Sequence, residues 1–381
     1  MIDLICAAYD TPEELKLKAD FICDVSDARP TLQKAIDKAD ALGVKCVLLK
    51  GTYTINSSGE RSKKGAICFY NPEEERKWYS HNKARYHVFE GAKTPLGYLD
   101  GAIITIGAEF YNSLPDNEEF SLFYCDGNAR MGRGMLIRNI VVRLPGSHKP
   151  VVVFDGRFAG AVRYEDNWVS SFDPCKVNPA TAEGIPIPNP KSVAFRGCCG
   201  SNYYSTTWKY LAAQGFGVAF DIGGEHVYCE SLSALYNIYG FAFDCYKGKN
   251  YISDSDDFLA AGGCFYPVTC INLLDEHNIH MPRFGNASHN ANTREEWAQS
   301  ITIRGMNLQW PNSCPGYTDR NASDFMLGRH RAIEDQPGSW RGSIEYVIDH
   351  TTPGGGVNLV DEPFFEDGNG IYISVKNLHQ K

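Results

Sequence analysis

The sequence predicts an all-β fold whose chain winds as a solenoid. Short apolar runs recur between Gly, Asn, Asp and Ser residues, at positions 102–106, 135–142, 150–154, 193–195 and 301–308. A repeat of 23 residues begins at Gly217, Gly240 and Gly263. An antiparallel sandwich would contain similar runs. Only stacked coils have a reason to keep such a period, because each coil buries its inward side chains against its neighbours.

The columns of the repeat agree in chemistry. When residues 217–285 are written in three lines of 23, large apolar and aromatic side chains coincide. These columns are Phe220, Phe243 and Tyr266; Ile222, Cys245 and Val268; Tyr228, Tyr251 and Leu274; and Leu235, Phe258 and Met281. Residues 23 apart are therefore expected to be neighbours on adjacent coils.

One amphipathic helix is expected near the N-terminus, over residues 31–42. Its apolar residues recur at helical spacing, and Gly43 follows as a stop signal. A buried strand is expected next at 44–49, continued at 53–55. Further along, regular helix is hard to find.

Three segments differ from the short apolar runs. Residues 56–100 carry a run of charges, residues 167–190 carry several prolines, and residues 286–299 are polar. All three are expected to be long loops that leave the coils. Such loops either build the walls of a binding cleft or are simply solvated.

Residues 24–55 resemble the opening of the pectin-lyase-like proteins. The shared pattern is an acidic loop, then Leu32-Gln33-Lys34-Ala35-Ile36-Asp37, then Val47-Leu48-Leu49 and Gly51-Thr52-Tyr53-Thr54-Ile55. Two departures are visible. Residues 25–29 replace a Gly-rich turn with two aspartates, and Lys50 stands where a proline is common.

The resemblance implies a right-handed parallel β-helix whose N-terminal helix caps the open end of the stack. Residues 1–55 would then form the segment with the capping helix and first strand, and residues 56–381 the coils with their loop insertions, within one domain. A homotrimer is a further expectation from the resemblance. The reaction is left open, because the family includes polysaccharide lyases, glycoside hydrolases, epimerases, fructotransferases and phage tail-spike depolymerases. Of the polygalacturonase motifs, a paired aspartate is present at 256–257, but Gly-His-Gly and Arg-x-Lys are absent.

The repeat register selects the candidate catalytic residues. One column holds Glu230, Ser253 and Glu276, and the next holds Asp254 and His277. By strand spacing, the two glutamates would lie roughly 9 to 10 Å apart, and Glu230 and Asp254 roughly 5 to 6 Å apart. Both separations suit glycosidase carboxylates. The three carboxylates are therefore candidates for acid and base roles, and the histidine for tuning or relaying a proton.

Further side chains near these columns are candidates for substrate binding. They are His226, Lys249, Tyr251, Asp256, Asp257, His280, Arg283 and Trp208. The alternative to a functional role is that the acidic residues are ordinary turn residues and that the aromatic ones belong to the core. Asp221 and Asp244 form another stacked acidic pair, which fits a turn position better than a site.

Composition limits the partners. The 37 basic and 46 acidic residues give a formal charge of −9, which disfavours a nucleic-acid backbone. No window is apolar enough to span a bilayer, and residues 1–8 lack the features of a signal peptide. The expected location is cytoplasmic, with a phage particle or a trimmed secreted form left open.

The 13 cysteines are expected to be mostly buried thiols, and no metal or other cofactor is expected.

Three functional hypotheses follow. The first is a carbohydrate-active enzyme that cleaves or transfers a glycosidic bond by carboxylate acid and base catalysis. The second is a polysaccharide lyase acting on a uronic-acid polymer, served by His226, Lys249, Tyr251 and Arg283. The third is a non-catalytic or phage-associated glycan-binding protein.

Overall fold

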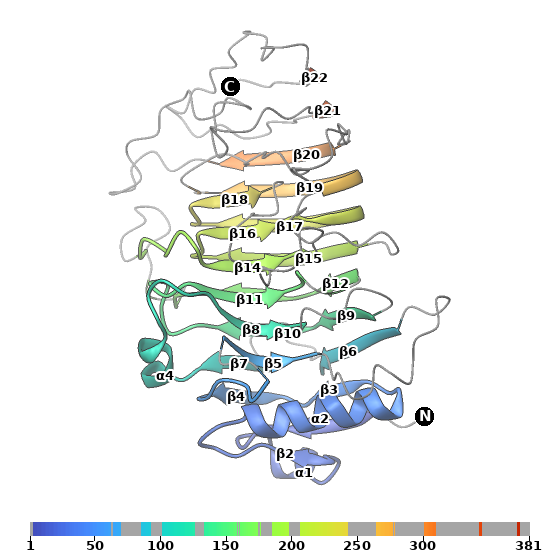
Figure 1. Ribbon diagram of the computed structural model, residues 1–381, viewed down its shortest axis with the longest axis vertical. Helices are drawn as coiled ribbons and strands as arrows, with labels where there is room; N and C mark the ends of the chain where they lie inside the picture. The colour runs from blue at the N-terminus through green and yellow to red at the C-terminus, as the bar shows by residue number, and fades with distance from the viewer. Residues whose placement is uncertain are drawn as a thin grey trace, which may run out of the picture.

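The computed structural model describes residues 3–61, 64–69, 85–92, 101–125, 133–157, 159, 161–173, 176, 185–197, 206–242, 264–276, 278, 301–309, 343–344 and 372–373. The expected loop at 286–299 lies outside them. The described chain is rich in strands that pair in parallel and has few helices. In Figure 1 the strands follow one another along the long axis in chain order, with α2 near the N-terminal end.

Among the described residues, the strands form two sheets. The larger has 16 strands and the smaller has six. The larger contains β1 (Leu4–Ala7), β2 (Phe21–Ile22), β3 (Cys46–Leu48), β4 (Gly51–Ile55), β6 (Arg85–Gly91), β7 (Ala102–Ile106), β9 (Arg133–Arg138), β10 (Ile140–Arg143), β12 (Ala161–Glu165), β13 (Trp168–Ser170), β15 (Thr206–Gln214), β17 (Gly224–Leu235), β19 (Cys264–Glu276), β20 (Ile301–Gln309), β21 (Ser343–Ile344) and β22 (Tyr372–Ile373). The smaller contains β5 (Gly65–Cys68), β8 (Phe120–Tyr124), β11 (Val151–Asp155), β14 (Val193–Arg196), β16 (Val218–Asp221) and β18 (Tyr239–Ala242).

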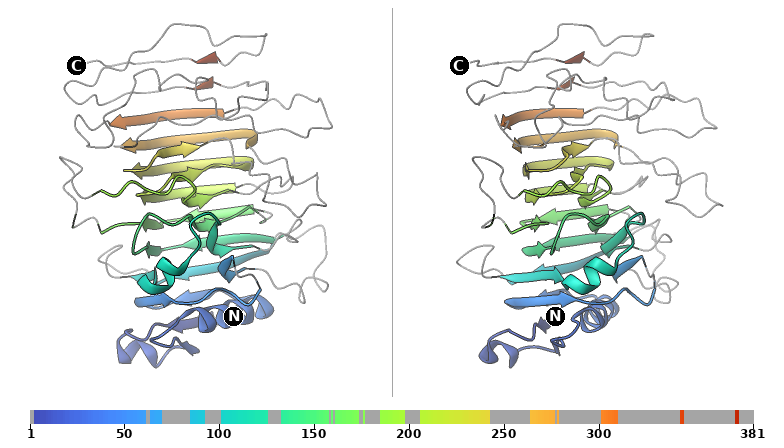
Figure 2. Two further views of the ribbon diagram at one scale, coloured as in Figure 1. Left: turned by 60° about the vertical axis from the view of Figure 1, so that its left-hand side comes forward. Right: turned by 90° about the vertical axis from the view of Figure 1, so that its left-hand side faces the viewer.

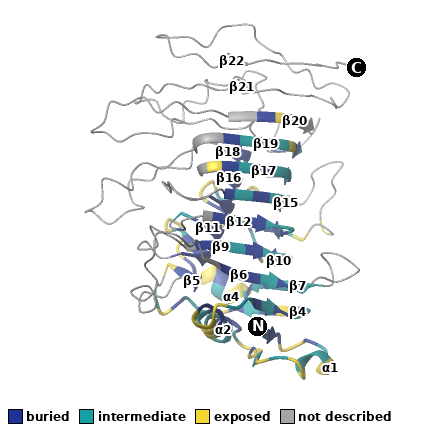
Figure 3. Ribbon diagram, turned by 90° about the vertical axis from the view of Figure 1, so that its right-hand side faces the viewer, coloured by how far each residue is buried: buried dark blue, intermediate teal, exposed yellow. Residues whose placement is uncertain are grey.

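The helices in the described part of the chain are α1 (Glu13–Lys16), α2 (Arg29–Leu42) and α4 (Ala108–Ser113). The expected N-terminal helix is confirmed as α2, which buries one apolar stripe that includes Leu32, Ala35 and Ile36. Gly43 ends it in the left-handed conformation, with φ 72° and ψ 31°. Figure 3 shows exposed residues on α1 and α2, while buried residues follow the strands up the stack.

The apolar runs predicted the strands well, but two of the expected loops contain strands. Runs 102–106, 193–195 and 301–308 correspond to β7, β14 and β20. In contrast, β5 and β6 lie inside 56–100, and β13 lies inside 167–190. These strands were missed because they are short or carry polar residues, which a strand with one exposed face tolerates.

The register predicted from the 23-residue repeat is wrong. Strand β16 pairs with β18 so that Phe220 opposes Phe241, 21 residues on rather than 23. The third line of the repeat falls in the other sheet, where β19 pairs with β17 and Val227 opposes Val268. For β16 and β18 the slip is two residues, which keeps every side chain on the same face, so the apolar columns there still agree at the wrong period.

Side chains from both sheets share one buried apolar cluster. Within it, aromatic rings of the smaller sheet stack from strand to strand, with centroids 5.3 Å apart between Phe123 and Phe154 and 5.2 Å between Phe154 and Phe195. Phe220 and Phe241 continue the stack at 5.3 Å per step. Figure 2 shows the strands from two further sides, stacked from the N-terminal to the C-terminal end.

Buried asparagines satisfy backbone groups where the chain bends. The side chain of Asn237 accepts a hydrogen bond from the Phe216 amide at 2.9 Å and donates to Asn278 Oδ1 at 2.8 Å. Asn167 does the same at another bend, accepting from the Ile140 amide at 3.0 Å. These side chains replace backbone partners that the bends take away.

The expectation of buried thiols is confirmed for seven described cysteines, which are buried and form no disulfide: Cys6, Cys23, Cys46, Cys68, Cys125, Cys229 and Cys270.

Candidate functional site

A row of charged side chains runs across five neighbouring strands of the larger sheet. Register places Glu90, Arg138, Glu165, Lys209 and Glu230 opposite one another on β6, β9, β12, β15 and β17. The signs alternate along this charged row, as cross-strand pairs favour. Two ion pairs form, Arg138 to Glu90 at 2.7 Å and Lys209 to Glu230 at 3.0 Å.

Strand alternation and a bend place the row on the outside. In β15, Trp208 points into the core while its neighbours Thr207 and Lys209 are partly exposed. Tyr210 then adopts a left-handed conformation with φ 55°, as Ser231 does directly after Glu230. The bend leaves the Tyr210 side chain 47% exposed beside the row.

Two tyrosines complete the surroundings of Glu230. The Tyr228 hydroxyl donates to Glu230 Oε2 at 3.2 Å, and the Tyr210 hydroxyl donates to Oε1 at 3.5 Å. Lys209 Nζ also lies 5.0 Å from the centroid of the Tyr228 ring. We call Lys209, Tyr210, Tyr228 and Glu230 the Glu230 cluster. It presents a carboxylate, an ammonium group and two phenol rings on one exposed surface.

The contacts set the protonation states of this cluster. The hydrogen bond from Lys209 is the main reason that the pKa of Glu230 is lowered, with the tyrosine hydroxyls adding to it. The same hydrogen bond raises the pKa of Lys209. Near neutral pH, Glu230 is therefore a carboxylate that can accept a proton, while Lys209 is a cation that cannot.

A second carboxylate lies in the same row. Glu165 and Glu230 flank Lys209 on either side, two strand spacings apart. This corresponds to roughly 9 to 10 Å between backbones, close to the range of about 6.5 to 9.5 Å for inverting glycosidases. Glu165 was missed in the sequence because it lies outside the repeat from which the columns were drawn.

The predicted pairing of Glu230 with Glu276 is wrong. Glu230 opposes Ile271 on β19, whereas Glu276 opposes Leu235. Between those two positions the chain turns at Asn272, where φ is 57°. Five residues of strand separate Glu276 from the row, up to roughly 16 Å along the chain, so these two glutamates do not share one substrate position.

Of the other predicted residues, the structure describes only Trp208 and His226. Trp208 has an exposed fraction of 0% and packs 5.4 Å from Tyr164 in the core, so it cannot contact a substrate. His226 is exposed on the strand that carries Glu230, with φ 52°. The remaining predicted residues lie outside the described residues: Asp254, His277, Lys249, Tyr251, Asp256, Asp257, His280 and Arg283.

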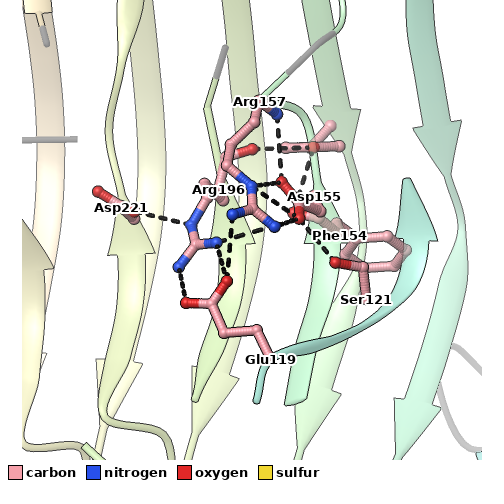
Figure 4. Close-up of polar contacts among 8 residues, drawn as sticks. Glu119, Ser121, Phe154, Asp155, Arg157, Arg196 and Asp221 are labelled. Carbon is pink, nitrogen blue, oxygen red and sulfur yellow. Dashed lines mark hydrogen bonds and ion pairs between the residues drawn. The ribbon is translucent and has the colours of Figure 1, made fainter. Parts of the chain in front are cut away.

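A second cluster of charges is buried at the ends of strands in the smaller sheet (Figure 4). Arg196 donates from Nε to Asp221 at 3.0 Å. Its two terminal nitrogens donate to the two carboxylate oxygens of Glu119 at 3.0 and 3.1 Å. Arg157 bonds Asp155 and lies 3.1 Å from Glu119. We call these five residues the ion cluster. Register explains its assembly, because positions 155, 196 and 221 oppose one another on β11, β14 and β16.

Asp155 is the most constrained member of the ion cluster. Burial opposes its ionisation, but Arg157 and Arg196, with hydrogen bonds from Arg157 and Ser121, outweigh burial and lower its pKa from 3.8 to about 2. The Ser121 hydroxyl donates to it at 2.7 Å. Its side chain is 3% exposed, so this carboxylate supports the fold rather than meeting a substrate.

The sequence does contain a signal for the ion cluster. A phenylalanine, a charged residue and a glycine recur at 154–156 and at 195–197, and a phenylalanine followed by a charged residue recurs at 220–221. Asp221, which was expected at a turn rather than in a site, is the last residue of β16, is 1% exposed and is bound to Arg196.

No known protein family, curated protein or solved structure matches this chain. Within the described part of the chain, no three metal-ligating side chains gather to hold an ion, and no helix has the length and apolar character needed to cross a membrane. The Glu230 cluster with Glu165 is therefore the candidate site, on its geometry alone.

Proposed function

We propose that the chain is a right-handed parallel β-helix and that it acts as a carbohydrate-active enzyme which cleaves or transfers a glycosidic bond. Two parallel sheets around a shared core, with α2 near one end of the stack, support the fold proposal. The activity rests on one observation, the pair of carboxylates Glu165 and Glu230 that flank Lys209 on an exposed face.

The proposed chemistry is an inverting hydrolysis. Glu230 accepts a proton from a water molecule whose oxygen attacks the anomeric carbon. The bond between that carbon and the leaving oxygen breaks, and the leaving oxygen takes a proton from Glu165. The lowered pKa of Glu230 keeps it in the carboxylate form that a base requires, and the exposed ring of Tyr210 offers a face on which a sugar can stack.

The lyase hypothesis is less well supported by the same residues. β-Elimination needs a cation to neutralise the uronate and a base to remove a proton from carbon. Lys209 is already engaged by Glu230, and its raised pKa keeps it protonated. A binding protein without activity would use the same surface, so the test must separate binding from turnover.

The test compares single amide substitutions on neutral oligosaccharides, with new reducing ends as the readout. E230Q and E165Q are each expected to lower kcat by about 100-fold or more, as loss of an acid or base does, while oligosaccharide binding is retained. E90Q is the matched control, because Glu90 lies in the same row and also pairs with a cation but does not flank Lys209.

The outcomes discriminate the hypotheses. Equal turnover in all three variants would contradict the assignment of the site. Product with new ultraviolet absorbance would indicate a lyase, since only β-elimination creates a double bond. Oligosaccharide binding by the wild-type protein with no turnover of any oligosaccharide would replace the enzyme proposal by a binding function.

A second measurement tests the role of Lys209. K209M removes the main cause of the lowered Glu230 pKa. The acidic limb of the rate profile should therefore move to higher pH, because the base stays protonated over a wider range. An unchanged limb would mean that Glu230 is not the titrating base.

A further inference from the structure

Two cysteines lie side by side at the N-terminal end of the stack. Cys6 belongs to β1, and Cys23 directly follows β2, which pairs with β1 in parallel. Their sulfur atoms are 3.6 Å apart, and the residues are 0% and 3% exposed. The backbone holds this approach, because the Cys23 amide donates to the Ala7 carbonyl at 2.8 Å. A disulfide of about 2.05 Å needs the sulfurs to close by roughly 1.5 Å, which small side-chain rotations can supply.

The closed fold protects these thiols. The hydrogen bond with Cys23 and burial raise the pKa of Cys6, and burial raises the pKa of the neighbouring Cys46 to about 12. Because the thiolate is the reactive species, reaction requires that the thiols first reach water.

The position of Cys23 makes such an opening easy. Strand β2 is only two residues long and is the outermost strand at its end of the larger sheet. Ile22 and Val25, on either side of Cys23, are 54% and 62% exposed. A two-residue strand at the edge of a sheet, next to exposed side chains, opens at a small fraction of the global free energy of unfolding.

We propose that Cys6 and Cys23 are a reversible disulfide site that is oxidised by a small-molecule disulfide. On local opening, the Cys23 thiolate attacks one sulfur of the small disulfide, forming a mixed disulfide and releasing one thiolate. The Cys6 thiolate then attacks the Cys23 sulfur and releases the second. In sum, two protein thiols and one small disulfide become one protein disulfide and two small thiols.

The disulfide would stabilise the N-terminal end of the stack against local opening. It closes a loop whose ends are 17 residues apart, which joins the outermost strand covalently to β1. Cross-linking a loop of this size lowers the population of the open state by roughly 100-fold. The Cys23 amide donates to the Ala7 carbonyl, so its rate of hydrogen exchange reports on that opening.

The test incubates the folded full-length protein with oxidised glutathione and then maps its peptides under non-reducing conditions. The expected result is a linked pair of peptides containing Cys6 and Cys23, a loss of two hydrogens in mass, and reversal by dithiothreitol. Exchange of the Cys23 amide should slow by about 100-fold on oxidation. C23A should abolish the link, and C46A, which removes the neighbouring thiol, should retain it.

Three outcomes would overturn the proposal: a stable glutathione adduct without ring closure, a link that uses Cys46, or no reaction while peptide-mapped thiols elsewhere react. The peptide map of the wild-type protein decides among these even if a variant fails to fold.

Discussion

Replacing Asp155 by asparagine is expected to destabilise the fold strongly at neutral pH and much less in acid. The substitution keeps the size of the side chain but removes the negative charge that faces Arg157 and Arg196. Both arginines are almost fully buried, with side chains 11% and 3% exposed. Breaking a buried ion pair by removing one partner typically costs about 3 to 5 kcal/mol, because the remaining charge stays buried without compensation.

The pH dependence can be worked out from the pKa of Asp155. Its value falls from 3.8 to about 2 on folding, a difference that corresponds to roughly 2.4 kcal/mol. Because the folded pKa is the lower one, this stabilisation is fully present above about pH 5 and is lost as the pH falls through the folded value. Between pH 5 and pH 2, the gap between wild type and D155N should close by about 2 kcal/mol.

Denaturant unfolding curves of both proteins at several pH values between 7 and 2 measure this gap. E13Q is a suitable control, because Glu13 is 86% exposed and its pair with Lys16 lies on the surface of α1. It should leave the free energy of unfolding nearly unchanged throughout. A D155N gap that is small at pH 7, or constant down to pH 2, would refute the account of the ion cluster.

Four further substitutions test the core and the bends through the free energy of unfolding. F195A interrupts the aromatic stack and is expected to cost about 3 to 5 kcal/mol; a loss below about 1 kcal/mol would contradict close packing there. N237A removes the side-chain hydrogen bonds to two buried backbone groups, the Phe216 amide and the Ala213 carbonyl, and should cost about 2 to 4 kcal/mol; a neutral effect would indicate that water reaches these groups. G215A meets Ser171 and Phe172 at φ +82° and should destabilise more than G305A, where φ is +67° and the nearest atom is 3.8 Å away; the reverse order would be inconsistent with the packing.

Local elements could be predicted from the sequence because their signals are local. The helical spacing of apolar residues and the glycine at position 43 are enough to define α2. A short continuous apolar run such as 102–106 predicts a buried strand, and β7 has the same bounds. The prediction of loops at the charged and proline-rich segments was wrong where they contain strands, because polar residues such as those of β6 are also typical of loops.

Register could not be predicted in the same way. Phe220 aligns equally well with the residue 21 or 23 positions further on, because side-chain direction repeats every two residues. The spacing between paired strands also changes from one layer to the next, so no single period describes them. As a result, the repeat columns gave Glu276 the wrong neighbour, although Glu230 itself is partly exposed.

The sequence by itself determined the short strands, the helix α2 and the buried thiols, since each depends on the polarity of neighbouring residues. The tertiary structure alone decided which charges meet. Glu165 and Glu230 come together across Lys209, and Asp221 becomes a buried partner of Arg196, only because strands far apart in the chain pair in one register. That register follows from loop lengths and core packing together, which no local pattern records.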